Sequence, residues 1–287
     1  MADLFAAGGK RLRPALVLLT AKLGEYDFER VAPAAMAVEM LHTATLVHDD
    51  VIDASELRRG RPTVAAARGA AAAIVIGDYY ITRALRLAGA SGEPQVADVL
   101  GGAMLDICTG ELEQQASRHS YRIERARYLR RIELKTASLI AGACAMGGIL
   151  GRLRPPAVDA LRVFGRRLGV AFQVVDDVID YLGEEADAGK PVGQDLREGH
   201  ATLPLLLALE GPAGPDLETM LAEAGGVHGA GAERVIERVR GTGGVDAAMR
   251  FAAEEAAAAR NSLSSFEPGN ARAALEAMSR YLVSRSL

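Results

Sequence analysis

The sequence contains little of what secreted or thiolate-metal proteins are built from. Only two of its 287 residues are cysteines, Cys108 and Cys144, and neither has neighbours at a metal-ligand spacing. We therefore expect both to be buried free thiols in a reducing cytosol. The amino terminus also lacks the continuous apolar segment of a secretory signal. These absences predict a cytoplasmic protein.

Long apolar runs and a strong excess of one charge are missing as well. The longest apolar stretch, 136–150, falls short of the roughly 20 residues that cross a bilayer, and Lys135 and Arg152 bound it. We expect it to be a buried core helix and not a transmembrane segment. The net charge of −4 gives no reason to expect nucleic-acid binding.

Strand signals are nearly absent, because the chain has no Asn-Gly or Asp-Gly hairpin turn and no sustained alternation of β-branched residues. Hydrophobic residues, 49% of the chain, recur instead at helical spacing. Residues 136–150 and 156–180 are apolar on most faces, which is typical of central helices. We predict one all-α domain, a helical bundle over 1–287. Its expected helices are approximately 13–23, 30–54, 69–90, 94–119, 122–151, 156–183, 201–210, 215–224, 230–240, 245–264 and 269–285.

The pentapeptide DDVID occurs twice, as Asp49–Asp53 and as Asp176–Asp180, each time at the end of a long apolar helix. The first and last aspartates of each copy share a helix face. Two carboxylates about 4 Å apart repel by roughly 4 kcal/mol at an effective dielectric constant near 20. Because hard oxygen ligands suit Mg²⁺, which also takes phosphate oxygens, the clusters predict diphosphate capture by carboxylate-held Mg²⁺. The alternative is that each copy is only a solvated helix end.

Basic residues lie close to these acidic clusters. Arg58 and Arg59 follow the first copy, and GGKRLRP supplies Lys10, Arg11 and Arg13. Guanidinium groups bind phosphate oxygens bidentately, although any one of these residues could serve only surface solubility. A basic patch beside a Mg²⁺ site suggests two phosphorylated substrates, one held by metal and one by Lys and Arg alone.

The polar segment 184–199 carries three glycines and one proline and follows the second DDVID helix. A loop of this kind beside a functional cluster predicts a lid or binding loop.

Several motifs together carry a resemblance to a known family. Their order and spacing, over roughly residues 8 to 285, resemble those of the trans-isoprenyl diphosphate synthases, and HTATLVHDDVID is similar to the medium- and long-chain polyprenyl branch. The motifs are GGKRLRP, EMLHTATLVHDDVIDASELRRGRPT, ELKTASL, AFQVVDDVIDYLG and GKPVGQDLREGHATLPLL.

The resemblance implies an all-α isoprenoid-synthase fold whose central cavity lies between the helices that bear the two aspartate motifs. It implies head-to-tail condensation of isopentenyl diphosphate with an allylic diphosphate, with two or three Mg²⁺ ions. The allylic diphosphate departs to leave a cation, which the isopentenyl double bond attacks before a proton is lost. It also implies a homodimer.

By matching position, the resemblance assigns roles to individual residues. Those of the metal site are Asp49, Asp50, Asp53, Asp176, Asp177 and Asp180. Those facing isopentenyl diphosphate are Lys10, Arg13, His42 and Arg59. Those on the allylic side are Arg58, Lys135, Thr136, Gln173 and Lys190, the last within the expected lid. For His42 the alternative is an ordinary core histidine.

The resemblance also implies that product length depends on the residues about one turn before Asp49, which line the growing chain. Ala44 and Thr45 are small there, so the upper cavity is expected to be open and the product longer than C20. Ala44 could instead be a packing residue, and a deeper floor could be set by Met104 or Leu105. Geranylgeranyl or farnesyl diphosphate synthase therefore remains an alternative.

Two departures from the family pattern stand out. Only seven residues precede Gly8, so the first helix is expected to be short or missing. His200 stands where many relatives have lysine, for which we expect altered diphosphate affinity and not loss of activity. A terpene cyclase is disfavoured by the second DDVID and by the basic patch. A non-catalytic subunit of a heteromeric synthase is disfavoured because both aspartate motifs are intact.

Overall fold

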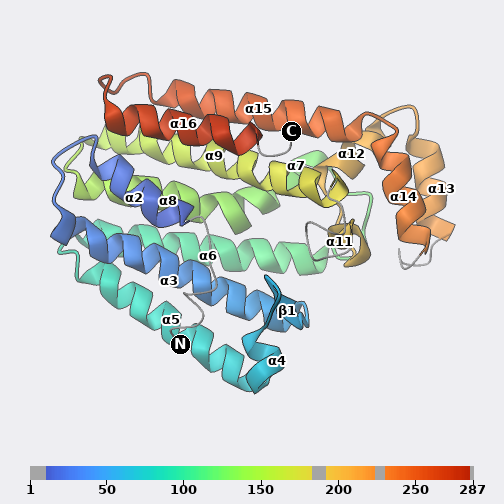
Figure 1. Cartoon of the computed structure of the whole chain (residues 1–287), viewed down its shortest axis with the longest axis horizontal. Coiled ribbons are helices and arrows are strands. Elements are labelled where there is room, and N and C mark those ends of the chain that lie inside the picture. The colour runs from blue at the N-terminus through green and yellow to red at the C-terminus, as the bar shows by residue number, and fades with distance from the viewer. Residues whose placement is uncertain (1–10, 183–191, 224–229, 285–287) are drawn as a thin grey trace. The chain divides into compact units, whose positions relative to one another are not determined.

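The computed structural model describes residues 11–182, 192–223 and 230–284, and these form an almost entirely helical structure (Figure 1). The predicted all-α class is confirmed. In chain order the elements are α2 (Leu12–Ala21), α3 (Phe28–Ile52), β1 (Leu57–Arg58), β2 (Arg61–Pro62), α4 (Val64–Arg68), α5 (Ala70–Gly89), α6 (Pro94–Ala116), α7 (Arg125–Ile132), η1 (Glu133–Ala137), α8 (Ser138–Leu150), α9 (Pro155–Leu182), α11 (Gln194–Arg197), α12 (Leu203–Glu210), α13 (Gly214–Glu223), α14 (Ala230–Arg240), α15 (Gly244–Ser262) and α16 (Asn270–Ser284).

The chain divides into two compact units that interleave along the sequence. The first draws on Met1–Leu105, Leu139–Gly165 and Ser265–Leu275, and the second on Asp106–Ser138, Arg166–Ser264 and Glu276–Leu287. Helices α6, α9 and α16 each contribute residues to both units. The expectation of a single domain stays a prediction.

In the first unit, α3 packs along α5, and α2 packs against α3. Helix α3 begins at the N-cap Asp27, whose carboxylate accepts hydrogen bonds from the backbone N–H groups of Glu29 and Arg30. The contact with α5 is close at one point, because a Cβ added at Gly77 would lie 2.0 Å from Nε2 of His48. This imidazole donates from Nε2 to the carbonyl oxygen of Ile74 at 3.1 Å and so ties α5 to the end of α3.

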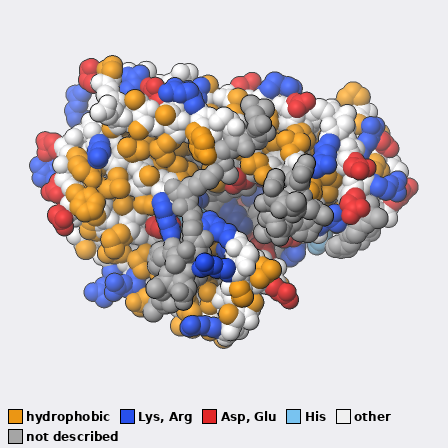
Figure 2. Space-filling model, in the orientation of Figure 1, with side chains coloured by type: hydrophobic (Ala, Val, Ile, Leu, Met, Phe, Trp, Pro, Cys, Tyr) orange, Lys and Arg blue, Asp and Glu red, His pale blue; other side chains and the backbone are white. Residues whose placement is uncertain are grey.

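The central-helix prediction is confirmed for α8, whose residues from Leu139 to Gly148 are all buried. The run Arg125–Leu150 is long and apolar enough to cross a membrane, but 67% of its most apolar window is buried, as in the core helix of a soluble protein. The exposed apolar side chains lie elsewhere. Figure 2 shows apolar side chains over α2 and α3 on the face in view, and Phe28 and Met36 are exposed in the first half of α3. Other large exposed apolar side chains lie on α5 and α6, such as Val75 and Leu105.

In the second unit, the single helix expected over 122–151 is interrupted. Residues Glu133–Ala137 form a π-helical turn, η1, between α7 and α8. Two glycines pack closely on this turn. A Cβ at Gly110 of α6 would lie 2.7 Å from the backbone nitrogen of Lys135, and one at Gly169 of α9 would lie 2.5 Å from Cα of Ala137. π turns of this kind are frequent at functional sites.

Three further expectations need correction. A two-stranded antiparallel hairpin pairs Leu57 with Pro62 and Arg58 with Arg61, although no hairpin was expected. Helix α11 lies in the segment expected to be a loop. Both cysteines are free, as expected, but only Cys144 is buried and Cys108 is exposed. The hairpin was missed because its turn is Arg-Gly and not one of the common dipeptides.

Candidate active site

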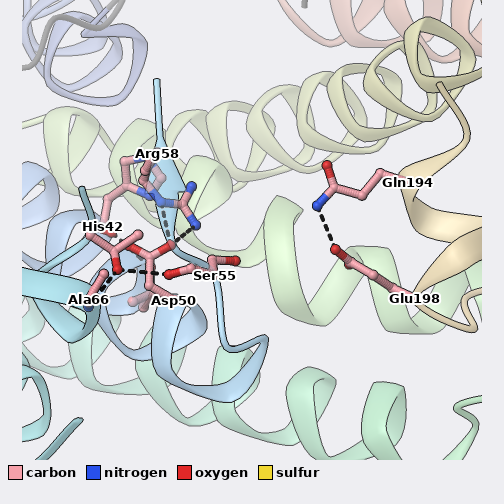
Figure 3. Close-up of polar contacts among 9 residues, drawn as sticks. His42, Asp50, Ser55, Arg58, Ala66, Gln194 and Glu198 are labelled. Carbon is pink, nitrogen blue, oxygen red and sulfur yellow. Dashed lines mark hydrogen bonds and ion pairs between the residues drawn. The ribbon is translucent and has the colours of Figure 1, made fainter. Parts of the chain in front are cut away.

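The first aspartate motif lies at the carboxyl end of α3. Asp49 and Asp53 lie one turn apart and are partly exposed, whereas Asp50 is only 4% exposed. The Arg58 guanidinium donates to one oxygen of Asp50, Oδ1, from Nε at 2.8 Å and from Nη2 at 2.7 Å (Figure 3). Asp50 is therefore held by the protein, and its two flanking aspartates are nearer to solvent.

Two of the three arginines of the hairpin after α3, Arg58 and Arg59, have different environments. Arg59 and Gly60 form the turn with φ values of 52° and 72°. Positive φ at both central positions is the mark of a tight hairpin turn, and it is strained for a residue other than glycine. Arg58 reaches back to α3, while Arg59 stays exposed. Thr63 closes the base by donating its hydroxyl to the Ser55 carbonyl at 2.8 Å and accepting from the Ala66 N–H at 3.0 Å (Figure 3).

His42 lies within a group of four arginines. Burial, and then the charges of Arg13, Arg59, Arg58 and Arg11, lower the pKa of His42 to about 2. The imidazole is consequently neutral at physiological pH. The first unit therefore brings Arg13, Arg58 and Arg59 close to His42.

Arg11 is itself tied down. It makes an ion pair with Glu39 of α3, and its backbone has a φ of 48° at the start of α2. Lys10, which the sequence assigned to the same basic patch, lies outside the described residues. So does Lys190, together with 184–191, the first half of the expected lid.

The second aspartate motif ends α9 and has a different environment. Asp177 is 2% exposed. Its Oδ2 accepts a hydrogen bond of 2.5 Å from the Tyr128 hydroxyl, and its Oδ1 accepts one of 2.9 Å from Nε2 of Gln173. Asp176 and Asp180 are partly exposed. As in the first motif, the middle aspartate is the buried and protein-bound one.

Asp180 organises the second half of the segment expected to be a lid. Its two carboxylate oxygens accept hydrogen bonds from the backbone N–H groups of Gln194, at 3.0 Å, and of Asp195, at 3.1 Å. These are the first residues of α11, so Asp180 stabilises the start of this short helix. Gln194 also donates to Glu198, the residue that follows α11, at 2.5 Å (Figure 3).

Negative charge accumulates around this second motif. Burial raises the pKa of Asp177 to about 6, although its hydrogen bonds to Tyr128 and Gln173 act in the opposite direction. Loss of hydration, and then the charges of Asp180 and Asp177, raise the pKa of Asp195 well above its ordinary value. Carboxylates that resist ionisation in this way are stabilised by nearby cations.

Three of the residues expected on the allylic side, Lys135, Thr136 and Gln173, lie on η1 and α9. The Thr136 hydroxyl donates to Oε1 of Gln173 at 2.8 Å, so these two expected ligands touch. Lys135 makes an ion pair with Glu111 of α6. A hydrogen bond therefore connects the π turn to α9, and an ion pair connects it to α6.

His200 is 6% exposed in the second unit. Burial, and then the charges of Arg131, Lys135 and Arg118, lower its pKa to about 4. It is thus neutral at physiological pH. A lysine in the same place would add a positive charge to this basic surrounding.

Several residues of this region were not singled out from the sequence, namely Tyr128, Arg131, Glu111 and Asp195. The apolar spacing of Tyr128 and Ile132 indicates a buried face of α7. It does not indicate that the tyrosine hydroxyl reaches an aspartate 49 residues further along the chain.

No group of three or more His, Cys, Asp or Glu side chains within the described ranges is placed to hold a metal ion by itself. Mg²⁺ uses one or two carboxylates and completes its shell with water and substrate phosphates. The partly exposed outer aspartates of each motif are a donor set of this kind.

Known proteins are similar to this chain in sequence and in fold. Residues 1–239 match the family model described as Polyprenyl synthetase. A heptaprenyl diphosphate synthase component 2 from Geobacillus stearothermophilus is 45% identical over 206 residues, which cover 72% of this chain and 64% of that protein, less than two thirds of its length. The octaprenyl diphosphate synthase of Escherichia coli (strain K12) is 37% identical over 254 residues, covering 88% of this chain and 78% of that protein.

Among solved structures, a polyprenyl synthase from Caulobacter crescentus CB15, complexed with calcium and isoprenyl diphosphate, is 38% identical with a TM-score of 0.91. The match covers 98% of this chain and 87% of that one. Fold and relatives thus define an all-α prenyltransferase. The chain belongs to the polyprenyl synthetase family.

Proposed function

We propose that the chain condenses isopentenyl diphosphate with an allylic diphosphate, head to tail, to give an all-trans polyprenyl diphosphate. The observation that carries this proposal is the arrangement of the two aspartate motifs. In each, the middle carboxylate is bound by the protein and the outer two are partly exposed. In the reaction, the allylic C–O bond breaks, the isopentenyl double bond forms the new C–C bond, and a proton is lost to the departed diphosphate.

The metal in this proposal is Mg²⁺, with two or three ions. Asp49, Asp53, Asp176 and Asp180 would hold it together with substrate phosphate oxygens. Its chemistry is to neutralise charge that develops on the leaving diphosphate. Asp50 and Asp177 complete the six aspartates assigned by resemblance, and their protein hydrogen bonds favour a supporting role for them.

The remaining ligands are divided between the substrates. Arg13, His42 and Arg59 would bind isopentenyl diphosphate. The positive charges of the arginines lower the pKa of His42, and positive charge of this kind favours a bound anion. Lys10 is assigned to the same set. The allylic diphosphate would be bound by Arg58, Lys135, Thr136, Gln173 and Lys190.

The proposed product is longer than C20. Relatives are named heptaprenyl and octaprenyl diphosphate synthases, and the residues one turn before Asp49 are small. Ala44 is fully buried, and Thr45 donates its hydroxyl to the His42 carbonyl at 2.9 Å. Neither side chain offers the bulk that would stop a growing prenyl chain near the first motif.

The chain is proposed to be cytoplasmic and to pair with a second copy of itself. Helix α5 exposes the apolar side chains of Ile74, Val75 and Tyr79, which lie within about one and a half turns of each other. Exposed apolar side chains of this kind are suited to a protein partner. One observation favours a second candidate function: the Geobacillus relative is named as a component, which suits a subunit that needs a different partner chain.

The test is incubation of the purified chain with Mg²⁺, labelled isopentenyl diphosphate and allylic starters from C5 to C20, followed by chromatography. We expect all-trans products longer than C20 and none when EDTA removes the metal. Absence of prenyl product with every starter would overturn the catalytic proposal for the chain alone. Products that stop at C15 or C20 would overturn only the length.

A further inference from the structure

A buried tyrosine of α7 lies directly behind the second aspartate motif. The side chain of Tyr128 is fully buried, and its hydroxyl donates to Oδ2 of Asp177 at 2.5 Å. The two residues belong to the same unit. Because an ionised carboxylate has no proton to donate, the tyrosine must be the donor in this contact.

The hydrogen bond belongs to a chain of four side chains. Gln173 donates from Nε2 to the other oxygen of Asp177 at 2.9 Å, and Thr136 donates to Oε1 of Gln173 at 2.8 Å. Each donor is oriented by its neighbour, so the direction of the whole chain is set by the carboxylate. The chain joins α7, the π turn η1 and α9.

Arg131, one turn after Tyr128, supports this arrangement. It is 5% exposed, and its guanidinium lies over the Tyr128 ring at 5.5 Å from the centroid. Its Nη2 donates to the carbonyl oxygen of Ala201 at 2.8 Å. The stacked guanidinium holds the ring in place and supplies a buried positive charge near the Asp177 carboxylate.

We propose that Tyr128 is a positioning residue of the second aspartate motif. Together with Gln173 it keeps the Asp177 carboxylate turned into the protein, as an anchor that orients the end of α9 and not as a metal ligand. Asp176 and Asp180 then remain available to the metal and the diphosphate. The inference rests on the proposed function, because the motif must serve metal-dependent prenyl transfer for its orientation to matter.

The first experiment replaces the tyrosine hydroxyl alone, in Tyr128→Phe. Loss of this hydrogen bond to the charged Asp177 carboxylate should lower kcat roughly ten- to a hundredfold. We also expect a higher Mg²⁺ concentration for the half-maximal rate, because the released carboxylate turns toward solvent and disturbs the outer aspartates. The KM for isopentenyl diphosphate should stay unchanged, since its proposed ligands, Arg13, His42 and Arg59, lie in the first unit.

The matched control is Tyr181→Phe, a fully buried tyrosine on α9 whose hydroxyl makes no hydrogen bond to an aspartate within the described residues. Its kcat and Mg²⁺ dependence should match those of the unsubstituted chain. Rates are expressed per folded enzyme, measured by circular dichroism. A Tyr128→Phe variant that is only less stable, with unchanged kcat and Mg²⁺ dependence, would overturn the proposal.

The second experiment separates an anchor from a ligand. In Asp177→Asn the amide oxygen still accepts from Tyr128, and its NH₂ group can donate to Gln173 once that amide and the Thr136 hydroxyl turn round. We expect a much smaller loss of kcat than in Asp176→Asn. Equal losses would show that Asp177 acts as a ligand and would overturn the inference. If the unsubstituted chain makes no product in the same assay, the proposed function fails instead.

Discussion

The two DDVID motifs have the same sequence but are held in different ways. In the first unit, Asp50 is bound by the charged Arg58 from a hairpin eight residues further along, and Arg58 keeps 36% of its side chain exposed. In the second unit, Asp177 is bound by two neutral donors, Tyr128 and Gln173, and the tyrosine comes from a distant helix and is fully buried.

The difference shows that one local pattern is compatible with two kinds of anchor. An arginine at the edge of solvent is open to water and salt, so its contact is weakened by screening. A buried tyrosine is shielded from both and depends on the fit of three helical segments. The first motif is therefore set mainly by its own neighbourhood in the sequence, and the second by tertiary packing.

The largest loss of activity should come from substituting the outer aspartates. At these positions the two motifs should behave alike. Asp49→Ala and Asp176→Ala should each lower kcat by about a hundredfold or more, because each removes a carboxylate from the proposed metal site. The control is Asp159→Ala, an exposed aspartate on α9. Product formation at saturating Mg²⁺ measures the effect, and normal turnover in either variant would refute the metal assignment.

The two motifs should differ most clearly at Arg58, the charged residue that holds the first one. Arg58→Ala leaves the buried Asp50 carboxylate without its arginine, which should lower the free energy of unfolding by roughly 1.5–3 kcal/mol. Adding Asp50→Asn to this variant should restore part of the loss, because the unpaired charge is then gone. Urea denaturation measures both. Arg61→Ala, an exposed arginine of the same hairpin, serves as the control, and an equal loss there would contradict the prediction.

A smaller change in stability is expected when glycines at helix contacts are replaced by alanine, and its size should depend on what each added methyl group meets. Gly169→Ala places a methyl group against the backbone of Ala137 and should cost roughly 1–3 kcal/mol of stability. Gly77→Ala meets the His48 side chain, which can turn away, so its cost should be lower. Gly101→Ala in α6 has no neighbour within 4 Å and should stabilise the helix slightly. Equal thermal shifts in all three variants would contradict this order.

The smallest effect is the change of stability with pH that two buried histidines cause. The pKa of His42 is lowered to about 2 and that of His200 to about 4, both below the ordinary 6.5. Below pH 6.5 the unfolded chain therefore binds more protons than the folded one at these sites, and stability falls as pH falls. The contribution of His200 should level off near pH 4, while that of His42 continues lower.

Denaturation of His200→Gln and His42→Gln between pH 7.5 and 4 measures this directly. Each variant should lose stability less steeply on acidification than the unsubstituted chain, because the substituted side chain takes up no proton. Parallel curves for variant and unsubstituted chain would contradict the assignment of a neutral buried histidine.

The sequence predicted the helical class and most helix positions, because long amphipathic and apolar segments carry a clear period. It also predicted that Asp49 and Asp53 share a face. It could not predict the partners of Asp50 and Asp177. Arg58 lies near Asp50 in sequence, but only the hairpin brings it back, and the Arg-Gly turn is a weak signal. Tyr128 reaches Asp177 through packing that no local pattern encodes.

The roles assigned by resemblance are unequally supported. Thr136 and Gln173 lie in contact, and four arginines surround His42. The roles of Ala44 and Thr45 in product length stay a prediction. The metal ligands do as well, and Lys10 and Lys190 lie outside the described residues.

The π turn at Glu133–Ala137 has an evolutionary consequence. A turn of this kind is what a one-residue insertion leaves in a continuous α-helix, and it shifts the phase of every residue on one side relative to the other. Deleting one residue here would let α7 run directly into α8, but it would rotate α7 by about 100° against α8. Tyr128 would then no longer point at Asp177. Insertion of a single residue in this helix is thus enough to turn the face of α7 that carries Tyr128 toward Asp177 while α8 keeps its own buried face.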